Sequence, residues 1–415
     1  MITRRTFLVG TGLTAAAASP PSWWIDPAEA TEPQPLKIPE LIDARQRGQG
    51  ISLNVQAGQT EFFPGRRSGT LGYNGSYLGP TLRVHQGDEV EIAVANKLRE
   101  ETTVHWHGLL IPAELDGSPH QPIAPGETWR PRLPIQQRAA TLWYHSHAHH
   151  RTAEQVYGGL AGLLLVSDED ERELGLPHEY GVDDIPLVLQ DRQFDDGRMV
   201  IPSGMMTLMH GRRGETLLVN GTPNPVASVP GKVVRLRLVN GSNARIFNLS
   251  FGDGREFQWI ASDGGFLERA VSLKSLMLAP GERAEVLVDF SDGREIALQT
   301  ETDPNAPMMM GMMGRLRSAV SGIFDENVRE VLRFQPTERG DTPATLPDRL
   351  MSWQSADDSA ATRKRRVTLT MGMGGMMGGG MMGAGGMFGI NGKPFEMDFV
   401  NERANSEGSR PPIPR

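Results

Sequence analysis

The residues of this sequence best suited to metal binding or catalysis are four histidines in two short motifs. His105 and His107 lie in Thr-Val-His-Trp-His, and His145 and His147 lie in Leu-Trp-Tyr-His-Ser-His. Both runs are typical of β-strands, in which residues i and i+2 point to the same face. Four imidazoles from two neighbouring strands can converge on metal ions, and neutral imidazole suits copper, zinc or iron. One such pair alone would more often be a solvent-exposed face, but two pairs in one domain favour a metal site.

The rest of the sequence predicts β-sandwich or barrel domains that position these histidines. The 415 residues favour two or three domains, and the 48 Gly and 30 Pro favour many turns. Short alternating segments such as residues 90–94 and 233–238 indicate strands, and no long helical period competes with them. The net charge of −8 argues against a general nucleic-acid-binding surface.

An internal repeat indicates two similar β domains, at about 35–170 and 180–335. Residues 87–96 and 231–240 both follow the pattern Gly-x-x-Val-x-aliphatic-x-aliphatic-x-Asn. A second match, Ala-Pro-Gly-Glu, ends at Glu127 in the first copy and at Glu282 in the second, with one insertion between the two matches.

The repeat also predicts that only the first domain carries ligands. Extended without a gap, the alignment sets His105 and His107 against Leu249 and Phe251. We therefore expect an apolar core face in the second domain where the first domain has its first histidine pair.

The first thirty residues are predicted to be a twin-arginine signal peptide. Arg4 and Arg5 precede Phe7 and a short apolar stretch over residues 8–18, and Ala-Glu-Ala follows at 28–30. The apolar run is too short for a stable membrane anchor. We therefore expect the twin-arginine translocase to export the protein to the periplasm.

The surroundings of the histidines resemble those of the multicopper oxidases, and in particular the laccase-like cuprous oxidases of bacterial copper tolerance. The resemblance runs from the signal to about residue 397. It rests on residues 105–108, 116–117, 143–149 and 158–162, with support from 71–80 and 260–265.

This resemblance implies an all-β fold of tandem cupredoxin-like Greek-key β-sandwich domains. Two domains would be complete, the first with copper ligands and the second without. A linker over 336–365 would lead to the start of a third domain at 366–415, with a Met/Gly-rich insert.

The resemblance also assigns roles to individual residues. His105 would bind the mononuclear type 2 copper, and His107, His145 and His147 would bind the coupled type 3 pair. Asp116 matches an acidic residue that assists proton delivery to bound oxygen, although a turn-forming role before the following glycine is an equal alternative.

Ligands that complete the copper sites of the family are missing from this sequence. The family has two further histidine motifs in its third domain, and one of them carries the cysteine of the type 1 copper. Here no histidine follows His210, and cysteine is absent. After Asp398 the resemblance ends, which predicts a truncated third domain, through a frameshift, a sequence error or a natural two-domain derivative. Type 2 and type 3 ligands would then be present only in part, and the type 1 site would be absent.

The methionines gather in two tracts that glycine interrupts, and they form no helical stripe. The tracts hold more than half of the 20 methionines. Glycine spacing opposes a stable helix, and thioether sulfur is a soft ligand suited to Cu(I). We therefore predict Cu(I) capture in preference to a passive flexible linker. The residues are Met308, Met309, Met310, Met312, Met313, Met371, Met373, Met376, Met377, Met381, Met382 and Met387.

The function implied by the resemblance is that of a copper-dependent oxidoreductase in copper homeostasis. Such a multicopper oxidase would oxidise cuprous ion or small phenolic donors and reduce oxygen to water, with activity in doubt here because the type 1 cysteine is absent. The alternative is a periplasmic copper-binding protein without turnover. A copper-free relative that serves cell division lacks the histidine pairs, so their presence argues against that role.

Overall fold

The computed structural model describes residues 32–48, 50–204, 207, 210–301, 328–337, 348–352, 365–371 and 388–393. The chain divides into two units, Met1–Met351 and Ser352–Arg415. The predicted signal peptide lies outside the described residues, as do all the methionines of the two tracts except Met371. No helix in the described part of the chain is both long and apolar enough to cross a membrane.

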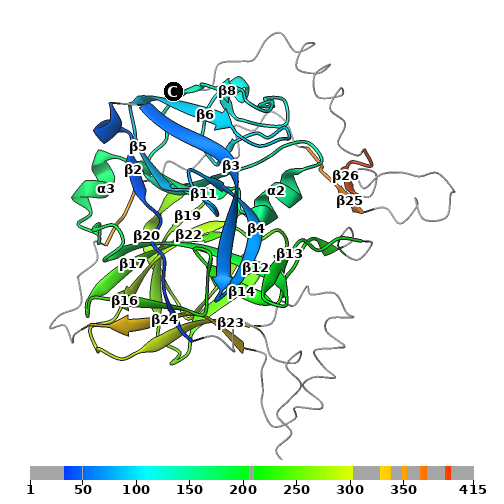
Figure 1. Cartoon of the computed structure of the whole chain (residues 1–415). Helices are drawn as coiled ribbons and strands as arrows, with labels where there is room; N and C mark the ends of the chain where they lie inside the picture. The colour runs from blue at the N-terminus through cyan, green and yellow to red at the C-terminus, as the bar shows by residue number, and fades with distance from the viewer. Residues whose placement is uncertain are drawn as a thin grey trace, which may run out of the picture. The chain divides into compact units, whose positions relative to one another are not determined.

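The first unit begins with a β-sandwich made of two sheets, blue to green in Figure 1. One sheet has the order β2 (Leu41–Asp43), β5 (Thr81–His85), β11 (Ala161–Ser167), β10 (Ala140–His145), β7 (His105–His107). The other has the order β4 (Arg66–Tyr73), β3 (Gly50–Phe63), β6 (Glu89–Asn96), β8 (Thr128–Trp129), with β9 (Arg132–Pro134) also paired to β6. The helical turns of this sandwich are η2 (Arg45–Arg47), η3 (Ala113–Leu115) and α2 (Thr152–Gly158).

A second β-sandwich follows, joined to the first through α3 (Glu169–Glu173). Its larger sheet has the order β15 (Thr222–Pro223), β14 (Thr216–Val219), β12 (Asp184–Asp195), β17 (Val233–Asn240), β22 (Arg283–Asp289), β19 (Phe257–Ser262), β20 (Gly265–Leu273), with β13 (Arg198–Val200) paired to β12. Its other sheet has the order β1 (Gln34–Pro35), β16 (Pro225–Val229), β24 (Val328–Pro336), β23 (Ile296–Glu301), β18 (Phe247–Phe251), β21 (Ser275–Leu278).

The two sandwiches repeat the same strand order. In the sheet with the histidines, β2, β5, β11, β10 and β7 correspond to β1, β16, β24, β23 and β18, and the β5–β11 and β16–β24 pairs are both parallel. The end of the sequence repeat is also equivalent. The side-chain amides of Asn96 and Asn240 each donate two hydrogen bonds to backbone carbonyls, and Gly126 and Gly281 donate a backbone hydrogen bond to the respective asparagine.

The histidine strand and its counterpart differ in which residues face the core. In β18, Leu249 and Phe251 are buried in the core of the second sandwich. In β7, Trp106 is fully buried in the first core, while His105 and His107 lie half-buried on the opposite face. The gap-free alignment therefore set the histidines against the wrong face, because a shift of one residue along a pleated strand exchanges its two faces.

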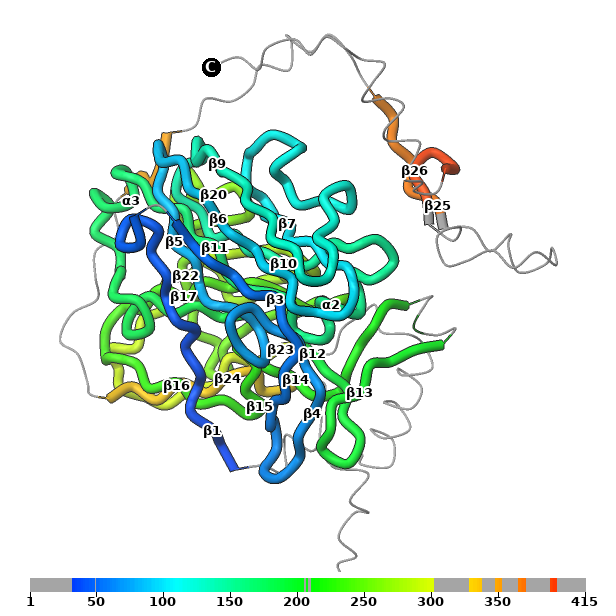
Figure 2. Tube along the Cα trace, turned by 45° about the horizontal axis from the view of Figure 1, so that its top comes forward, coloured from blue at the N-terminus to red at the C-terminus, as the bar shows by residue number. Residues whose placement is uncertain are grey.

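The apolar run of β11 is explained by burial on both of its faces. Leu164 and Val166 belong to the core of the first sandwich. Leu163 and Leu165 pack with Val188 and other apolar residues of the second sandwich. The hairpin of β3 and β4 extends the same interface, since Figure 2 shows it running beside β13 and β14 of the second sandwich. The two sandwiches therefore share apolar side-chain clusters along their contact.

Charged residues are also buried where the sandwiches meet. Arg237 is 3% exposed and contacts both carboxylate oxygens of Asp184, at 2.6 and 3.0 Å. The same guanidinium reaches Glu285 at 3.2 Å, Glu171 of α3 at 3.1 Å and the hydroxyl of Thr141 in the first sandwich at 3.0 Å. Buried charges are tolerated only when they are paired and hydrogen-bonded, so this network fixes the orientation of the two sandwiches.

The segment that follows the second sandwich is partly packed. Within the linker predicted over 336–365, Leu350 and Met351 are buried beside Ile260 and Leu287. In the second unit, β25 (Leu369–Met371) pairs with β26 (Phe388–Ile390), within the region predicted to begin a third domain at 366–415.

We expect Glu171→Gln to reduce the dependence of stability on acid pH. Burial alone would raise the pKa of Glu171, but Arg235 and Arg237 lower it from 4.5 to about 2. A carboxylate with a lowered pKa in the folded state stabilises the protein above pH 4.5 and loses this contribution as the pH falls towards 2. The variant should lose roughly 2–3 kcal/mol of unfolding free energy at pH 7.

Urea denaturation over a series of pH values measures this effect. The difference between wild type and Glu171→Gln should shrink between pH 4.5 and pH 2. Glu169→Gln on the same helix is the control, because Glu169 is 68% exposed in its side chain and pairs only with Arg172 among the ion pairs of the described residues. Equal pH profiles for the wild type and the Glu171 variant would contradict the prediction.

Candidate metal centre

The register of two strands places the histidines on one face of the first sandwich. β7 and β10 are antiparallel neighbours, with His105 directly opposite His145 and Trp106 directly opposite Tyr144. Trp106 and Tyr144 point into the apolar core, where neither is exposed to solvent. Because side chains alternate along a strand, His105, His107 and His145 must all lie on the other face.

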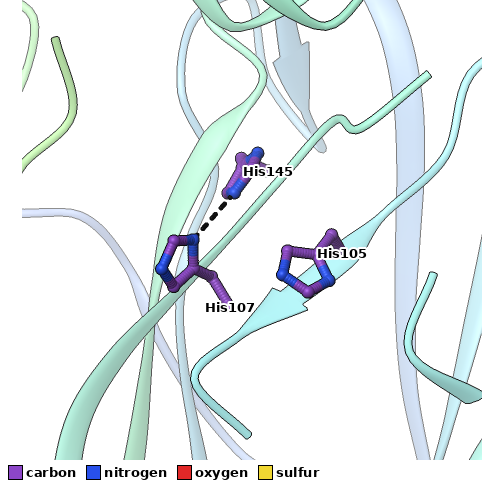
Figure 3. A group of neighbouring side chains, drawn as sticks. All are labelled: His105, His107 and His145. Carbon is purple, nitrogen blue, oxygen red and sulfur yellow. Dashed lines mark hydrogen bonds between the residues drawn. The ribbon is translucent and has the colours of Figure 1, made fainter. Parts of the chain in front are cut away.

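The four predicted histidines gather in the structure, and we refer to His105, His107, His145 and His147 as the histidine cluster. One nitrogen each of His105, His107 and His145 lies within 4.8 Å of the others, as Figure 3 illustrates. His107 Nδ1 and His145 Nε2 are 3.1 Å apart. His147 lies just beyond this trio, with ring-centroid distances of 5.5 Å to His105 and 5.9 Å to His145.

Backbone carbonyls orient two of the rings. His105 Nδ1 lies 3.0 Å from the carbonyl oxygen of Asp116, and His145 Nδ1 lies 2.8 Å from that of Ser146. A carbonyl can only accept, so each Nδ1 carries the proton and the lone pair of each ring lies on Nε2, which in His145 accepts from Nδ1 of His107. Metal-binding histidines in proteins are commonly oriented in this way.

Burial favours the neutral form of three rings of the cluster, those of His107, His145 and His147. Desolvation, followed by the cation of Arg283 and the neighbouring histidines, lowers the pKa of His107 to about 4. Desolvation also lowers the pKa of His145 well below its usual value and, more moderately, the pKa of His147. Metal binding requires neutral imidazole, so no proton has to be displaced from these three rings at pH 7.

Asp116 lies beside the cluster, at the end of η3. Its carboxylate Oδ2 is 3.2 Å from His105 Nδ1, and its backbone oxygen also accepts from the backbone N–H of Trp106. The next residue, Gly117, has φ +70°, and a Cβ there would meet the carbonyl of Val104 at 1.6 Å. Asp116 therefore ends a helical turn before Gly117 and contacts a ring of the cluster, and its assistance to proton delivery stays a prediction.

Sequence reasoning missed a contribution from the second sandwich. Arg283 is buried and sits against Gly108, where an added Cβ would approach its Nη2 to 2.6 Å. Gly281, in the loop before it, faces His107, since a Cβ there would lie 3.3 Å from the ring. The signal was available in part, because Gly281 belongs to the Ala-Pro-Gly-Glu repeat and Arg283 follows that repeat directly.

Models of the multicopper oxidase family match residues 54–171 and 188–303, which together make up more than half of the chain. The chain belongs to the multicopper oxidase family. Its fold is confirmed as tandem cupredoxin-like β-sandwich domains, and copper is the metal that membership of this family implies.

Solved structures of multicopper oxidases resemble the chain closely. A laccase-like multi-copper oxidase, CueO, from Ochrobactrum sp. is 41% identical, with a TM-score of 0.69, over 78% of this chain and 69% of that one. The multicopper oxidase McoA from Aquifex aeolicus is 33% identical, with a TM-score of 0.74, over 88% of this chain and 75% of that one.

Curated relatives carry a different name. Cell division protein FtsP of Escherichia coli is 43% identical over 297 residues, or 72% of this chain, and the chain spans only 62% of that relative's length. Cell division protein FtsP of Edwardsiella tarda is also 43% identical, over 84% of this chain and 72% of the relative.

The donor set of the histidine cluster fits copper. Imidazole nitrogen is a ligand that copper accepts readily, and three such nitrogens converge without a carboxylate in the trio. His147 adds a buried Nδ1 that has no hydrogen-bond partner among the described residues. An orphaned buried nitrogen is unfavourable unless something else binds it, which suits a metal-ligand position.

We expect the double variant His145→Ala with His147→Ala to lose copper. Removing two of the four imidazoles of the cluster should weaken copper affinity by more than about tenfold. Mutating residues that merely support metal ligands already weakens affinity by about 10–100-fold. Elemental analysis after dialysis against a fixed free copper concentration measures the metal content. His85→Gln is the matched control, since His85 pairs with Asp43 elsewhere in the same sandwich. Equal copper content in all three proteins would exclude these ligands.

Proposed function

We propose that this protein binds copper at the histidine cluster and takes part in copper-dependent oxidation in the periplasm. The observation that carries the proposal is the convergence of His105, His107 and His145 within 4.8 Å in a member of the multicopper oxidase family. In this proposal His105 is the ligand of a type 2 copper, and His107, His145 and His147 are ligands of a type 3 pair.

The residues around the cluster support such a role. Copper bound there would supply one-electron redox chemistry with oxygen as the acceptor. The hydrogen bonds from His105 and His145 to backbone carbonyls hold these rings with the lone pair on Nε2. The carboxylate of Asp116, 3.2 Å from His105, is placed to hold or release a proton beside the cluster. Arg283 lies against Gly108 beside the cluster, and the ring of Trp143 stacks on that of His145, with centroids 4.1 Å apart.

Cuprous ion is the electron donor that the chain's own composition favours over a small phenol. The two Gly-interrupted methionine tracts supply soft thioether ligands for Cu(I). Deleting residues 372–387 should therefore weaken Cu(I) binding, measured by competition with a chelator, and should leave Cu(II) binding at the histidine cluster unchanged. Equal Cu(I) affinity before and after the deletion would indicate that this tract is a passive linker and does not bind Cu(I).

Copper binding at the histidine cluster does not need the type 1 site, but the proposed oxidation does, so we expect turnover only where another component supplies that site. The blue type 1 site of the family needs a thiolate, and the 415 residues include no cysteine. We therefore expect the copper-loaded chain to show no intense blue absorption, and no oxygen uptake with cuprous ion or phenols beyond that of free copper. Absorption spectroscopy and an oxygen electrode test this. Turnover by the purified chain would show that electrons enter without a type 1 copper, or that a partner supplies the ligands.

A second candidate is a role in cell division without copper chemistry. It is favoured by the 43% identity to proteins named Cell division protein FtsP. The histidine cluster argues against it, since three convergent imidazoles with a fourth beside them have no evident use in a metal-free role. Copper content of the protein purified from its native host separates the candidates, because a copper-free protein would support the second.

Export by the twin-arginine pathway remains part of the proposal, and cell fractionation of an Arg4→Lys, Arg5→Lys variant tests it.

A further inference from the structure

A buried glutamine lies behind the histidine cluster. Gln155 is carried by α2, which begins five residues after His147, and is 1% exposed. Its side-chain oxygen accepts hydrogen bonds from the hydroxyls of Thr102, at 2.8 Å, and Ser146, at 2.5 Å. Its side-chain nitrogen donates to the carbonyl of Glu101 at 2.9 Å and to the carboxylate of Glu100 at 3.1 Å. The amide group thus has two partners on each side.

The partners of Gln155 lead directly to both halves of the cluster. Ser146 stands between His145 and His147, and its carbonyl accepts the hydrogen bond from His145 Nδ1. Thr103, next to Thr102, accepts the backbone N–H of His147 at 2.7 Å through its hydroxyl. The chain segment before β7 and the segment after β10 are therefore joined through one buried side chain.

We propose that Gln155 is a positioning residue for the copper centre. Its amide oxygen accepts from the hydroxyl of Ser146, and the carbonyl of Ser146 in turn orients the ring of His145 at the start of the segment that carries His147. The inference rests on the proposed function in one respect, namely that the histidine cluster binds copper. Supports of this kind orient ligands before the metal arrives and typically contribute about 10–100-fold to metal affinity.

The neutral amide is the chemical property that the position requires. A carboxylate of the same shape could still accept from the hydroxyls of Thr102 and Ser146. It could not donate to the carbonyl of Glu101, and it would place a negative charge about 3 Å from the carboxylate of Glu100. Gln155→Glu is therefore nearly isosteric and should disturb the network without leaving a cavity.

The Gln155→Glu variant should bind Cu(II) at least about tenfold more weakly than the wild type. It should also show altered hyperfine splitting in electron paramagnetic resonance spectra, because the imidazoles no longer hold the same geometry. Gln190→Glu is the matched control. Gln190 is equally buried and accepts from the hydroxyl of Tyr77 at the contact between the sandwiches. This control should keep the wild-type copper affinity and spectrum.

A double variant separates positioning from a general loss of folding. Adding Glu100→Gln to Gln155→Glu restores a donor opposite the new carboxylate and removes the repulsion. Copper affinity and the spectrum should then recover in part, whereas Glu100→Gln alone should change them little. Circular dichroism verifies that each protein is folded.

Each outcome bears on a different statement. Wild-type protein that binds no copper would overturn the proposed function, and this inference with it. Wild-type copper affinity and an unchanged spectrum in Gln155→Glu would overturn the positioning role alone. An equal loss in Gln190→Glu, or no recovery in the double variant, would also overturn it, since the effect would then come from destabilisation.

Discussion

The antiparallel pairing of β7 with β10 is the constraint on which the candidate metal centre depends. Trp106 and Tyr144 face each other in this pair and are buried in the first core. Their burial fixes the register, because a slip of either strand by one residue would move a large aromatic ring out of the first core and a histidine into it. The convergence of His105 and His145 on the opposite face follows from the same pairing.

Duplication supplied the scaffold, and divergence made the two copies complementary. Both sandwiches have the same strand order. In both, the repeated strand ends in an asparagine, Asn96 or Asn240, whose side-chain amide donates to a backbone carbonyl. The second copy has an apolar pattern in β18 where the first has histidines in β7. It still contributes to the centre, since Arg283 lowers the pKa of His107 and Gly281 lies against its ring.

Desolvation opposes the charged form at two places in the first unit, and the outcome differs between them. In the histidine cluster, burial disfavours the charged form, which leaves imidazoles ready for a metal. At the contact between the sandwiches, burial also opposes charge, but paired opposite charges overcome it, so Glu171 keeps a pKa of about 2. The difference lies in the neighbouring groups. The cluster brings imidazoles together, whereas the contact between the sandwiches pairs carboxylates with guanidinium groups.

The sequence by itself determined the strand-rich fold, the repeat and the face shared by His105 and His107, because these follow from a period of two residues and from local motifs. It placed His147 on the same strand as His145, whereas β10 ends at His145. That period cannot tell which face is the core, so the alignment of His105 with Leu249 assigned the wrong one. Only the tertiary structure brought Arg283 and Gln155 to the cluster and buried Leu350 within the predicted linker. These contacts join residues far apart in the chain, and no local pattern encodes which distant side chain will complete a site.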